Sequence, residues 1–234
     1  MKIFLTFGTT GEYKKRAERC IDLIKKLNVF DKLILLTEED LKKDYCFWNN
    51  HSKFIENNKR GYGYWLWKSY IIKKQLEKMN EDDILLYFDS SIIFHSDKDK
   101  FIKLFDKIKS DYIIGSFCKI LCTEYVWNKM DLIHYLDMNT NYYLNTRQRQ
   151  AGAIMILNNK KTRELVNNWY LLSSNYHFIN DNNSNIKNKT GFKEHRHDQS
   201  IFSLLTKKYN IYSTIDMFDF LNIWLLKHSR PLKQ

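Results

Sequence analysis

The residues with the clearest chemical potential stand at the end of a short apolar run. Residues 84–88 are apolar and are followed at once by Asp89, Ser90 and Ser91. A run of about five apolar residues before turn-forming residues indicates a buried strand of a parallel sheet, and α/β ligand sites lie at the carboxyl ends of such strands. A carboxylate there, followed by small hydroxyl residues, can bind Mg²⁺ or Mn²⁺ through oxygen and leave room for phosphates. The alternative is that Asp89 only caps a turn.

A second cluster precedes an apolar helical pattern. Residues 193–200 hold two imidazoles, two cations and two carboxylates. Asp198 could simply be the N-cap of the helix that follows. So many titratable groups together also indicate a nearby phosphate, metal or reacting hydroxyl. His195 and His197 would face the same side of an extended segment but would diverge on a helix.

A third cluster is the aromatic segment 60–68. Gly61 and Gly63 allow close approach of the backbone to a ligand, and Arg60 or Lys68 could meet a phosphate. The aromatic rings could stack on a base or sugar, or could pack in the core; they belong to Tyr62, Tyr64, Trp65 and Trp67. Neither a Gly-x-Gly-x-x-Gly motif, nor a Walker loop, nor a serine nucleophile elbow occurs. Their absence disfavours ordinary dinucleotide binding, P-loop nucleotide chemistry and catalysis by an elbow serine.

The elements that must position these clusters alternate along the chain. Patterns typical of strands cover residues 2–8, 32–37, 84–88, 112–117 and 150–156, and helical patterns separate most of them. Helices are expected at 64–79, after Ser96, at 126–136 and from 201, with a long polar loop at 180–193. The pattern predicts one α/β domain with a mainly parallel sheet covered by helices on both faces.

Composition limits the class of protein. The chain has 234 residues with a net charge of +11, which implies attraction to nucleic acid, a membrane surface or a phosphorylated ligand. The four cysteines are expected to be reduced core thiols. No apolar run reaches the length of a signal peptide or membrane span, so a cytoplasmic protein is expected. Segment 218–233 mixes apolar and basic residues and could lie on an anionic membrane or form a packed final helix.

Taken together, these residues resemble the small GT-A-type glycosyltransferases of bacterial and large-virus surface-glycan clusters. The resemblance spans most of the chain and lies in the order of four segments, at residues 6–9, 61–68, 87–91 and 195–200. It implies a Rossmann-like α/β/α fold in a single domain over 1–234, with a nucleotide-binding half at 1–95 and a donor-sugar and acceptor half at 96–234. It also implies sugar transfer from a nucleotide-diphospho-sugar, with a UDP-sugar expected, to a glycan or lipid-linked acceptor.

The resemblance also assigns roles to residues. It places Asp89 and Ser91 on a Mn²⁺ or Mg²⁺ ion, although Ser91 stands where the usual Asp-x-Asp element has its second Asp. His197, or else His195, would complete the metal shell, and Asp198 and Gln199 would lie beside the donor sugar and acceptor. The residues expected to bind the donor are Thr6, Gly8, Thr9, Arg60, Tyr64, Trp65, Lys68, Ser90, Gln150, Ala151, Gly152 and Arg196.

The mechanism and two other functions stay open at this point. Asp198 would be the general base of an inverting reaction, whereas Asp198 or Gln199 would stabilise the oxocarbenium-like centre of a retaining one. Ser91 suggests, as an alternative, a nucleotide-sugar-binding protein without turnover. The net charge of +11 and 15% aromatic residues suggest a nucleic-acid-binding module, but the dispersed basic residues disfavour it.

Overall fold

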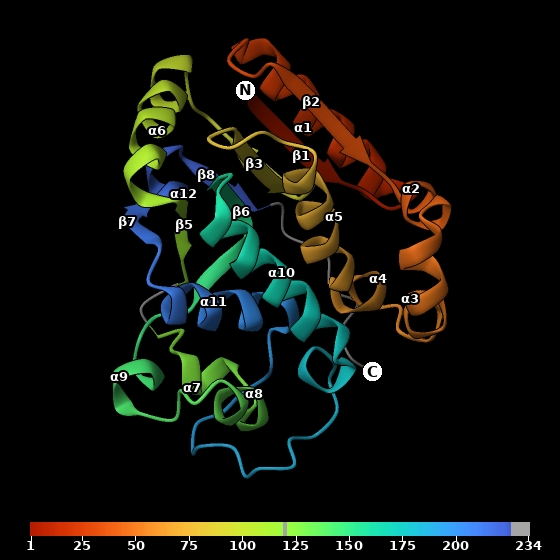
Figure 1. Cartoon of the computed structure of the whole chain (residues 1–234), viewed down its shortest axis with the longest axis vertical. Coiled ribbons are helices and arrows are strands. Elements are labelled where there is room, and N and C mark those ends of the chain that lie inside the picture. Colours follow the sequence, from red (N-terminus) through yellow and green to blue (C-terminus); the bar gives the residue numbers. More distant parts are fainter. Residues whose placement is uncertain (119–120, 226–234) are drawn as a thin grey trace.

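The computed structural model describes residues 1–118 and 121–225 (Figure 1). The strands are β1 (Lys2–Phe7), β2 (Lys32–Leu36), β3 (Ile84–Asp89), β4 (Ile92–Phe94), β5 (Ile113–Phe117), β6 (Arg149–Leu157), β7 (Tyr212–Asp216) and β8 (Ile223–Leu225). The longer helices are α1 (Glu12–Leu27), α3 (Tyr45–Asn57), α5 (Leu66–Glu77), α6 (Lys98–Asp111), α10 (Lys160–Ser174) and α11 (His197–Tyr209). The short ones are α2 (Glu38–Lys43), α4 (Gly61–Tyr64), α7 (Glu124–Trp127), α8 (Met130–Tyr135), α9 (Asn141–Leu144), α12 (Met217–Phe220) and the 3₁₀ turn Tyr176–Phe178.

The central sheet has six strands in the order β2-β1-β3-β6-β5-β7. All pair in parallel except β6, which runs antiparallel to both β3 and β5. The prediction of a mainly parallel sheet is therefore confirmed. Because β6 is reversed, its first residues lie at the same edge of the sheet as the carboxyl ends of β1, β3 and β5, and this edge carries the candidate site.

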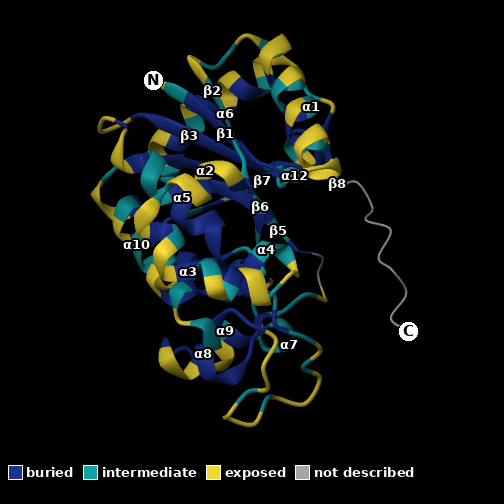
Figure 2. Ribbon diagram, turned by 90° about the vertical axis from the view of Figure 1, so that its right-hand side faces the viewer, coloured by how far each residue is buried: buried dark blue, intermediate teal, exposed yellow. Residues whose placement is uncertain are grey.

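Helices cover both faces of this sheet, as the alternating pattern predicts. Side chains alternate along β3, so that Leu85 and Tyr87 pack on the side of α5, α10 and α11, and Leu86 and Phe88 pack on the side of α1 and α6. Figure 2 shows the strands as a buried layer with the exposed residues on the outer faces of the helices. The two apolar cores fix the sheet from both sides, which makes its edge a rigid support for functional groups.

Three helix predictions differ from the structure. The helix expected at 64–79 is broken at Trp65, whose φ is 60°. The one expected at 126–136 is divided into α7 and α8, because Asn128 and Lys129 have extended backbones. The packed final helix considered for 218–233 is wrong for its described part, since 223–225 form β8, which pairs with β4 in a second, two-stranded sheet.

The basic residues of the C-terminal segment lie outside the described residues, so the alternative of a membrane contact there is not tested; they are Lys227, His228, Arg230 and Lys233. In the described ranges, every helix is too short or too polar to cross a bilayer.

The break before α5 is a left-handed turn. All five residues from Gly61 to Trp65 have positive φ, between 53° and 83°. Hydrogen bonds close the turn, from Tyr64 N to Arg60 O at 2.8 Å and from Trp65 N to Gly61 O at 3.1 Å. A left-handed backbone costs about 1–2 kcal/mol for each residue with a side chain. Such strain persists only where the surroundings enforce it, and it is concentrated at ligand sites.

Gly63→Ala is expected to destabilise the fold by about 2–4 kcal/mol. A Cβ atom on Gly63 would lie 2.7 Å from Ile55 Cγ1, and the φ of 83° is unfavourable for alanine. Gly191→Ala is the control, because Gly191 also has positive φ, of 92°, but an added Cβ would meet only Tyr125 Cε2, at the ordinary contact distance of 3.5 Å. Urea unfolding measures both variants. Equal losses in the two would contradict a steric role for Gly63.

Candidate active site

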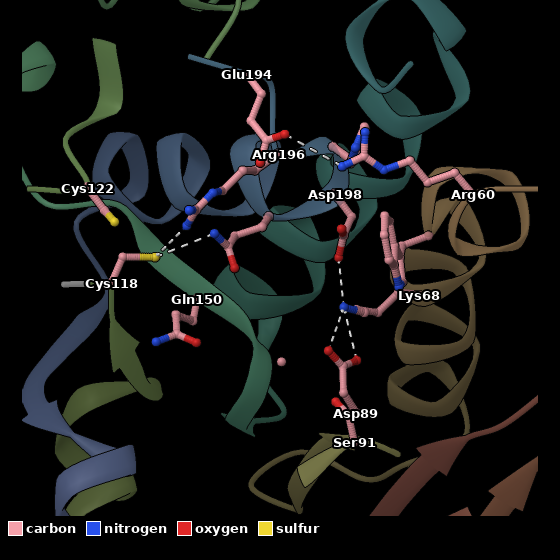
Figure 3. Close-up of a pocket in the computed structure, with 14 residues that line it drawn as sticks. Arg60, Lys68, Asp89, Ser91, Cys118, Cys122, Gln150, Glu194, Arg196 and Asp198 are labelled. Atoms are coloured by element: carbon pink, nitrogen blue, oxygen red, sulfur yellow. Dashed lines mark hydrogen bonds and ion pairs between the residues drawn. The ribbon is translucent and has the colours of Figure 1, made fainter. Parts of the chain in front are cut away.

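A cavity of about 460 Å³ opens at the carboxyl edge of the sheet. Its walls come from the end of β3, the start of β6, helix α5, the left-handed turn and the first turn of α11 (Figure 3). Most of the residues predicted to form a site line it, namely Arg60, Trp65, Lys68, Asp89, Ser91, Gln150, Gly152, Arg196, His197, Asp198 and Gln199. Segments more than 100 positions apart in the sequence therefore meet where the resemblance predicts a site.

Lys68 joins two carboxylates of the cavity, those of Asp89 and Asp198 (Figure 3). Its Nζ lies 2.8 Å from Asp198 Oδ2 and 3.1 Å from Asp89 Oδ1, and it donates to the Ala151 carbonyl at 3.3 Å. Asp89 also accepts a hydrogen bond of 2.7 Å from the Tyr87 hydroxyl. With one cation between two carboxylates, this Asp89–Lys68–Asp198 triad has a net charge of −1 when all three groups are ionised.

Burial and pairing act in opposite directions on the triad. Burial by itself would lower the pKa of Lys68, but the carboxylates of Asp198 and Asp89 raise it above its usual value. Burial raises the pKa of Asp198 to about 6, and the Lys68 ammonium limits that rise. At neutral pH the ammonium and the Asp198 carboxylate are therefore both charged, and Asp198 titrates close to the physiological range.

The first turn of α11 places Asp198 differently from the capping alternative. Arg196 occupies the N-cap position, and Asp198 is the second residue of the helix. Its carboxylate points into the cavity and pairs with Lys68 (Figure 3). The interpretation of Asp198 as the N-cap is thus wrong, and the carboxylate instead lines the cavity.

His197 carries an unpartnered ring nitrogen. Its Nδ1 donates to the Ile179 carbonyl at 2.7 Å, and its Nε2 is buried without a hydrogen bond, 3.7 Å from Asp181 Oδ1. The ring stacks on Tyr64 and Trp65, with centroid distances of 4.9 and 5.5 Å. Burial lowers the pKa of His197 to about 4, so the imidazole is neutral at pH 7 and Nε2 keeps a free lone pair.

His195 is placed differently and does not line the cavity. Its Nε2 contacts the Phe178 carbonyl at 2.8 Å, and its Nδ1 accepts from the Lys129 amide at 3.3 Å. Burial lowers the pKa of His195 well below its usual value, and it stays neutral. Both ring nitrogens are committed, so the alternative that His195 binds a cation finds no support here. Across 1–118 and 121–225, no group of three His, Cys, Asp or Glu side chains is arranged to hold a metal ion.

A second cavity of about 290 Å³ lies at the end of β1 and shares Trp65 and Asp89 with the first. Gly8, Thr9 and Ser90 line it, as predicted for donor-binding residues. Thr6 does not, because its buried hydroxyl donates to the Phe88 carbonyl at 2.8 Å. Glu38 also lines this cavity and accepts from the Thr10 amide at 2.6 Å. Glu38 was not among the predicted residues, although a carboxylate directly after the strand expected at 32–37 is a signal that could have indicated it.

Two arginines supply positive charge to the larger cavity. Arg60 is paired with Asp181 at 3.0 Å and with Glu194 at 3.8 Å. Arg196 lies 3.7 Å from the centre of the Trp127 ring and has no carboxylate within 4.0 Å among the described residues. The guanidinium of Arg196 is therefore the more available of the two for an anionic ligand.

Three of the predicted residues have structural roles. The side chain of Ala151 is buried, and only its carbonyl reaches Lys68. A Cβ on Gly152 would lie 2.9 Å from Asp89 Oδ2, so this glycine makes room for the carboxylate. Tyr64 packs on His197 and lines neither cavity.

The cysteines were only partly described by the prediction. All four are free thiols, and Cys20 and Cys118 are buried as expected, but Cys46 is exposed. Cys118 and Cys122 line the larger cavity, although neither was predicted to lie at the site. Gln199 contacts Cys118 Sγ at 3.5 Å and donates to Gln148 Oε1 at 2.8 Å, so its amide is fixed at the cavity wall.

No family model matches the sequence, and no curated protein matches it. Among solved structures, mouse xyloside xylosyltransferase 1 is similar with a TM-score of 0.50 and 12% identity, covering 92% of this chain and 86% of its own. The galactosyltransferase LgtC, in complex with donor and acceptor sugar analogues, has a TM-score of 0.48, 13% identity and coverages of 91% and 72%. The glycosyltransferase GlyE of Streptococcus pneumoniae has a TM-score of 0.46, 14% identity and coverages of 91% and 44%. The fold of this chain is therefore that of the GT-A-type glycosyltransferases, as the order of its sequence motifs predicts.

Proposed function

We propose that this chain transfers a sugar from a nucleotide-diphospho-sugar to a hydroxyl of a glycan or lipid-linked acceptor. The observation that carries the proposal is the Asp89–Lys68–Asp198 triad at the carboxyl edge of a GT-A-type sheet. It lies where two cavities meet, because Asp89 lines both of them. A donor needs such a pair of connected spaces, one for its nucleotide and one for its sugar.

The smaller cavity is suited to the nucleotide. Gly8 and Thr9 lie at the end of β1, and the rings of Tyr62 and Trp65 offer surfaces for stacking on a base. The diphosphate would then lie near Asp89, where the two cavities join, and the sugar would extend towards Gln150 and Asp198. We propose a UDP-sugar as the donor.

The residues of the larger cavity can stabilise the leaving diphosphate. Negative charge develops on the bridging oxygen as the sugar leaves, and fixed cations stabilise that charge. Arg196 lies over the Trp127 ring, donates to Cys118 Sγ at 3.4 Å and pairs with no carboxylate among the described residues, and Lys68 is held in place by Asp89 and Asp198. The acceptor hydroxyl would be positioned beside Asp198 and Gln199.

The GT-A fold also implies a divalent cation, Mn²⁺ or Mg²⁺. The free lone pair of His197 Nε2, buried at the cavity wall, fits such an ion, as do the oxygens of Asp89 and Ser91. Lys68 already neutralises part of the Asp89 charge, so we expect the ion to need diphosphate oxygens in addition to these three side chains. When bound, it would supply further neutralisation of the leaving group.

Asp198 can act in either stereochemical outcome. As a carboxylate with a pKa of about 6, it can take the proton of an acceptor hydroxyl at neutral pH. In a retaining reaction, the same carboxylate or the amide of Gln199 would instead face the positive charge that develops on the sugar. In either of these roles, Asp198 acts as the ionised carboxylate.

Nucleotide sugars are expected to stabilise the folded protein. A ligand at 100 times its dissociation constant adds about 2.7 kcal/mol to the free energy of unfolding, which raises Tm by about 5–10 °C in a chain of this size. Thermal unfolding with a panel of UDP-, GDP-, CDP- and dTDP-sugars, each with and without Mn²⁺, measures this. We expect one donor to give the largest rise and Mn²⁺ to increase it. If no nucleotide sugar raises Tm at millimolar concentration, the proposal fails.

Nucleotide-sugar binding without transfer is the second candidate, and two observations favour it. Ser91 stands where a second carboxylate is usual, and Lys68 ties both remaining carboxylates together. Incubation of the stabilising donor with a set of glycan acceptors separates the two functions. Detection of a glycosylated product by mass spectrometry would dismiss this second candidate.

A further inference from the structure

Another cavity, of about 440 Å³, lies beside the start of β6. Neighbouring residues on a strand point to opposite faces. Gln150 accordingly lines the candidate active site, whereas Arg149 lines this cavity. Its walls are aromatic and cationic, formed by Phe117, Tyr142, Tyr143, Arg147, Arg149 and Lys207. The function proposed above uses none of these residues.

Arg149 is half-buried, and two of its three guanidinium nitrogens are buried without a polar partner. Its Nε and Nη1 atoms are shielded from solvent and have no hydrogen bond. The group lies 4.2 Å from the centre of the Tyr212 ring, and it pairs with no carboxylate in the part of the chain that the structure describes. Burial lowers the pKa of Arg149, as expected for a guanidinium without a counter-ion. The guanidinium has no counter-ion to offset its partial burial, so an anionic ligand in the cavity that Arg149 lines would be favoured.

The other two cations of the cavity are already engaged. Lys207 pairs with Glu124 and donates to Thr146 Oγ1 at 2.7 Å and to the Arg147 carbonyl at 2.8 Å. Arg147 donates through Nε to the Cys118 carbonyl at 2.8 Å. Glu124 is fully buried, and its carboxylate pairs with Lys207 and accepts hydrogen bonds from Ser203 and Asn128. The cavity thus has an excess of positive charge, and Arg149 is its uncommitted donor.

The aromatic wall adds a surface for a ring. Tyr142 is 78% exposed, and its ring meets that of Tyr143 edge to face at 4.8 Å. An exposed tyrosine pair next to a cationic pocket suits a ligand with an apolar ring face and a charged end. A guanidinium binds carboxylate and phosphate through two parallel hydrogen bonds, which adds geometric preference to charge.

We propose that this cavity binds the carboxylate or phosphate of an acidic sugar, with the anion on Arg149 and the sugar ring against Tyr142 and Tyr143. The site is separate from the donor cavity, because it uses the opposite face of β6. Free inorganic phosphate shares the anionic chemistry and lacks the ring. A comparison of the affinities for sugar anions and for inorganic phosphate therefore shows whether the bound anion comes from an acidic sugar or from free phosphate.

Isothermal titration calorimetry of the full chain with glucuronate, glucose 6-phosphate, inorganic phosphate and glucose tests the site at constant pH and ionic strength. We expect at least one sugar anion to bind at least fivefold more tightly than phosphate, and glucose not to bind. Arg149→Gln should weaken that binding at least tenfold. The matched control is Arg163→Gln, which removes an arginine paired with Glu81 at 2.9 Å on the surface and should change nothing.

Each other result overturns the proposal or part of it. Equal affinity for phosphate and the sugar anions would overturn the role of the tyrosines and leave a phosphate site. Absence of binding, or unchanged binding by Arg149→Gln, would overturn the site. Should Arg149→Gln not fold, Arg149→Lys is the second variant, because lysine keeps the positive charge but cannot form the two parallel hydrogen bonds of a guanidinium. It should weaken binding about fivefold. Titration of the same variants with nucleotide sugars tests the proposed function separately, since Arg149 lies outside the donor cavities.

Discussion

Asp198→Asn is expected to lower the rate of sugar transfer by about 10²–10⁴-fold, the range that a positioned acid or base contributes. Asparagine keeps the shape of the side chain but cannot take a proton or carry negative charge. The wild-type rate should rise with pH and reach half its maximum near pH 6, because the pKa of Asp198 is about 6. The variant should lack this rise. Product formation at saturating donor between pH 5 and 8 measures both effects.

Asp106→Asn is the matched control for this substitution. Asp106 lies on the surface of α6, where its carboxylate is 72% exposed and 3.2 Å from Lys109, and its loss should leave the rate unchanged. The rise in Tm of the Asp198→Asn protein on addition of donor measures donor binding, and it shows whether the cavity is intact. An Asp198→Asn protein that binds donor and retains more than a third of wild-type activity would contradict any role of Asp198 in the reaction.

The same pKa also predicts the sign of a stability change. The pKa of Asp198 is raised from 3.8 to about 6 by burial, so the folded state binds this proton more tightly than the unfolded state does. The stabilisation from protonated Asp198 is complete below pH 4 and is lost as pH rises towards 6. The stability of the wild type relative to Asp198→Asn should therefore fall across this interval. His197, with a pKa lowered to about 4, acts in the opposite direction in both proteins and cancels in the comparison.

The parts of the site that could be predicted from the sequence are local ones. Asp89 follows an apolar run, and this pattern alone places a carboxylate at the end of a buried strand. Gly8, Thr9 and Ser90 were found in the same way, because each lies at or just beyond the end of a predicted strand. In such cases the order of residues within one segment determines where the side chain lies relative to the sheet.

The arrangement of the triad could not be predicted from local patterns. Lys68 and Asp198 lie 2.8 Å apart but belong to α5 and α11, and only the packing of both helices on one face of the sheet joins them. The left-handed turn was also missed, since Tyr62, Tyr64 and Trp65 have positive φ that their residue types disfavour. Strand β8 was mistaken for helix because its pairing with β4 depends on residues about 130 positions earlier.

Lys68→Met is expected to destabilise the protein by about 3–5 kcal/mol, the cost of removing one partner from a buried ion pair. Methionine has nearly the length of the lysine chain, so the packing of α5 changes little. The loss of the ammonium leaves Asp89 and Asp198 without the cation that lies within 3.1 Å of both. Urea unfolding at pH 7 measures the change, and transfer activity should be lost as well.

Lys73→Met is the control on the same helix, because Lys73 belongs to a partly exposed pair with Glu77 and its loss should cost at most about 1 kcal/mol. The double variant Lys68→Met/Asp198→Asn then separates charge from packing. If repulsion and desolvation of the two carboxylates cause the loss, neutralising Asp198 should restore a large part of the stability, although not the activity. If the double variant is as unstable as the sum of the two single variants, Lys68 acts through packing, and the electrostatic account of the triad fails.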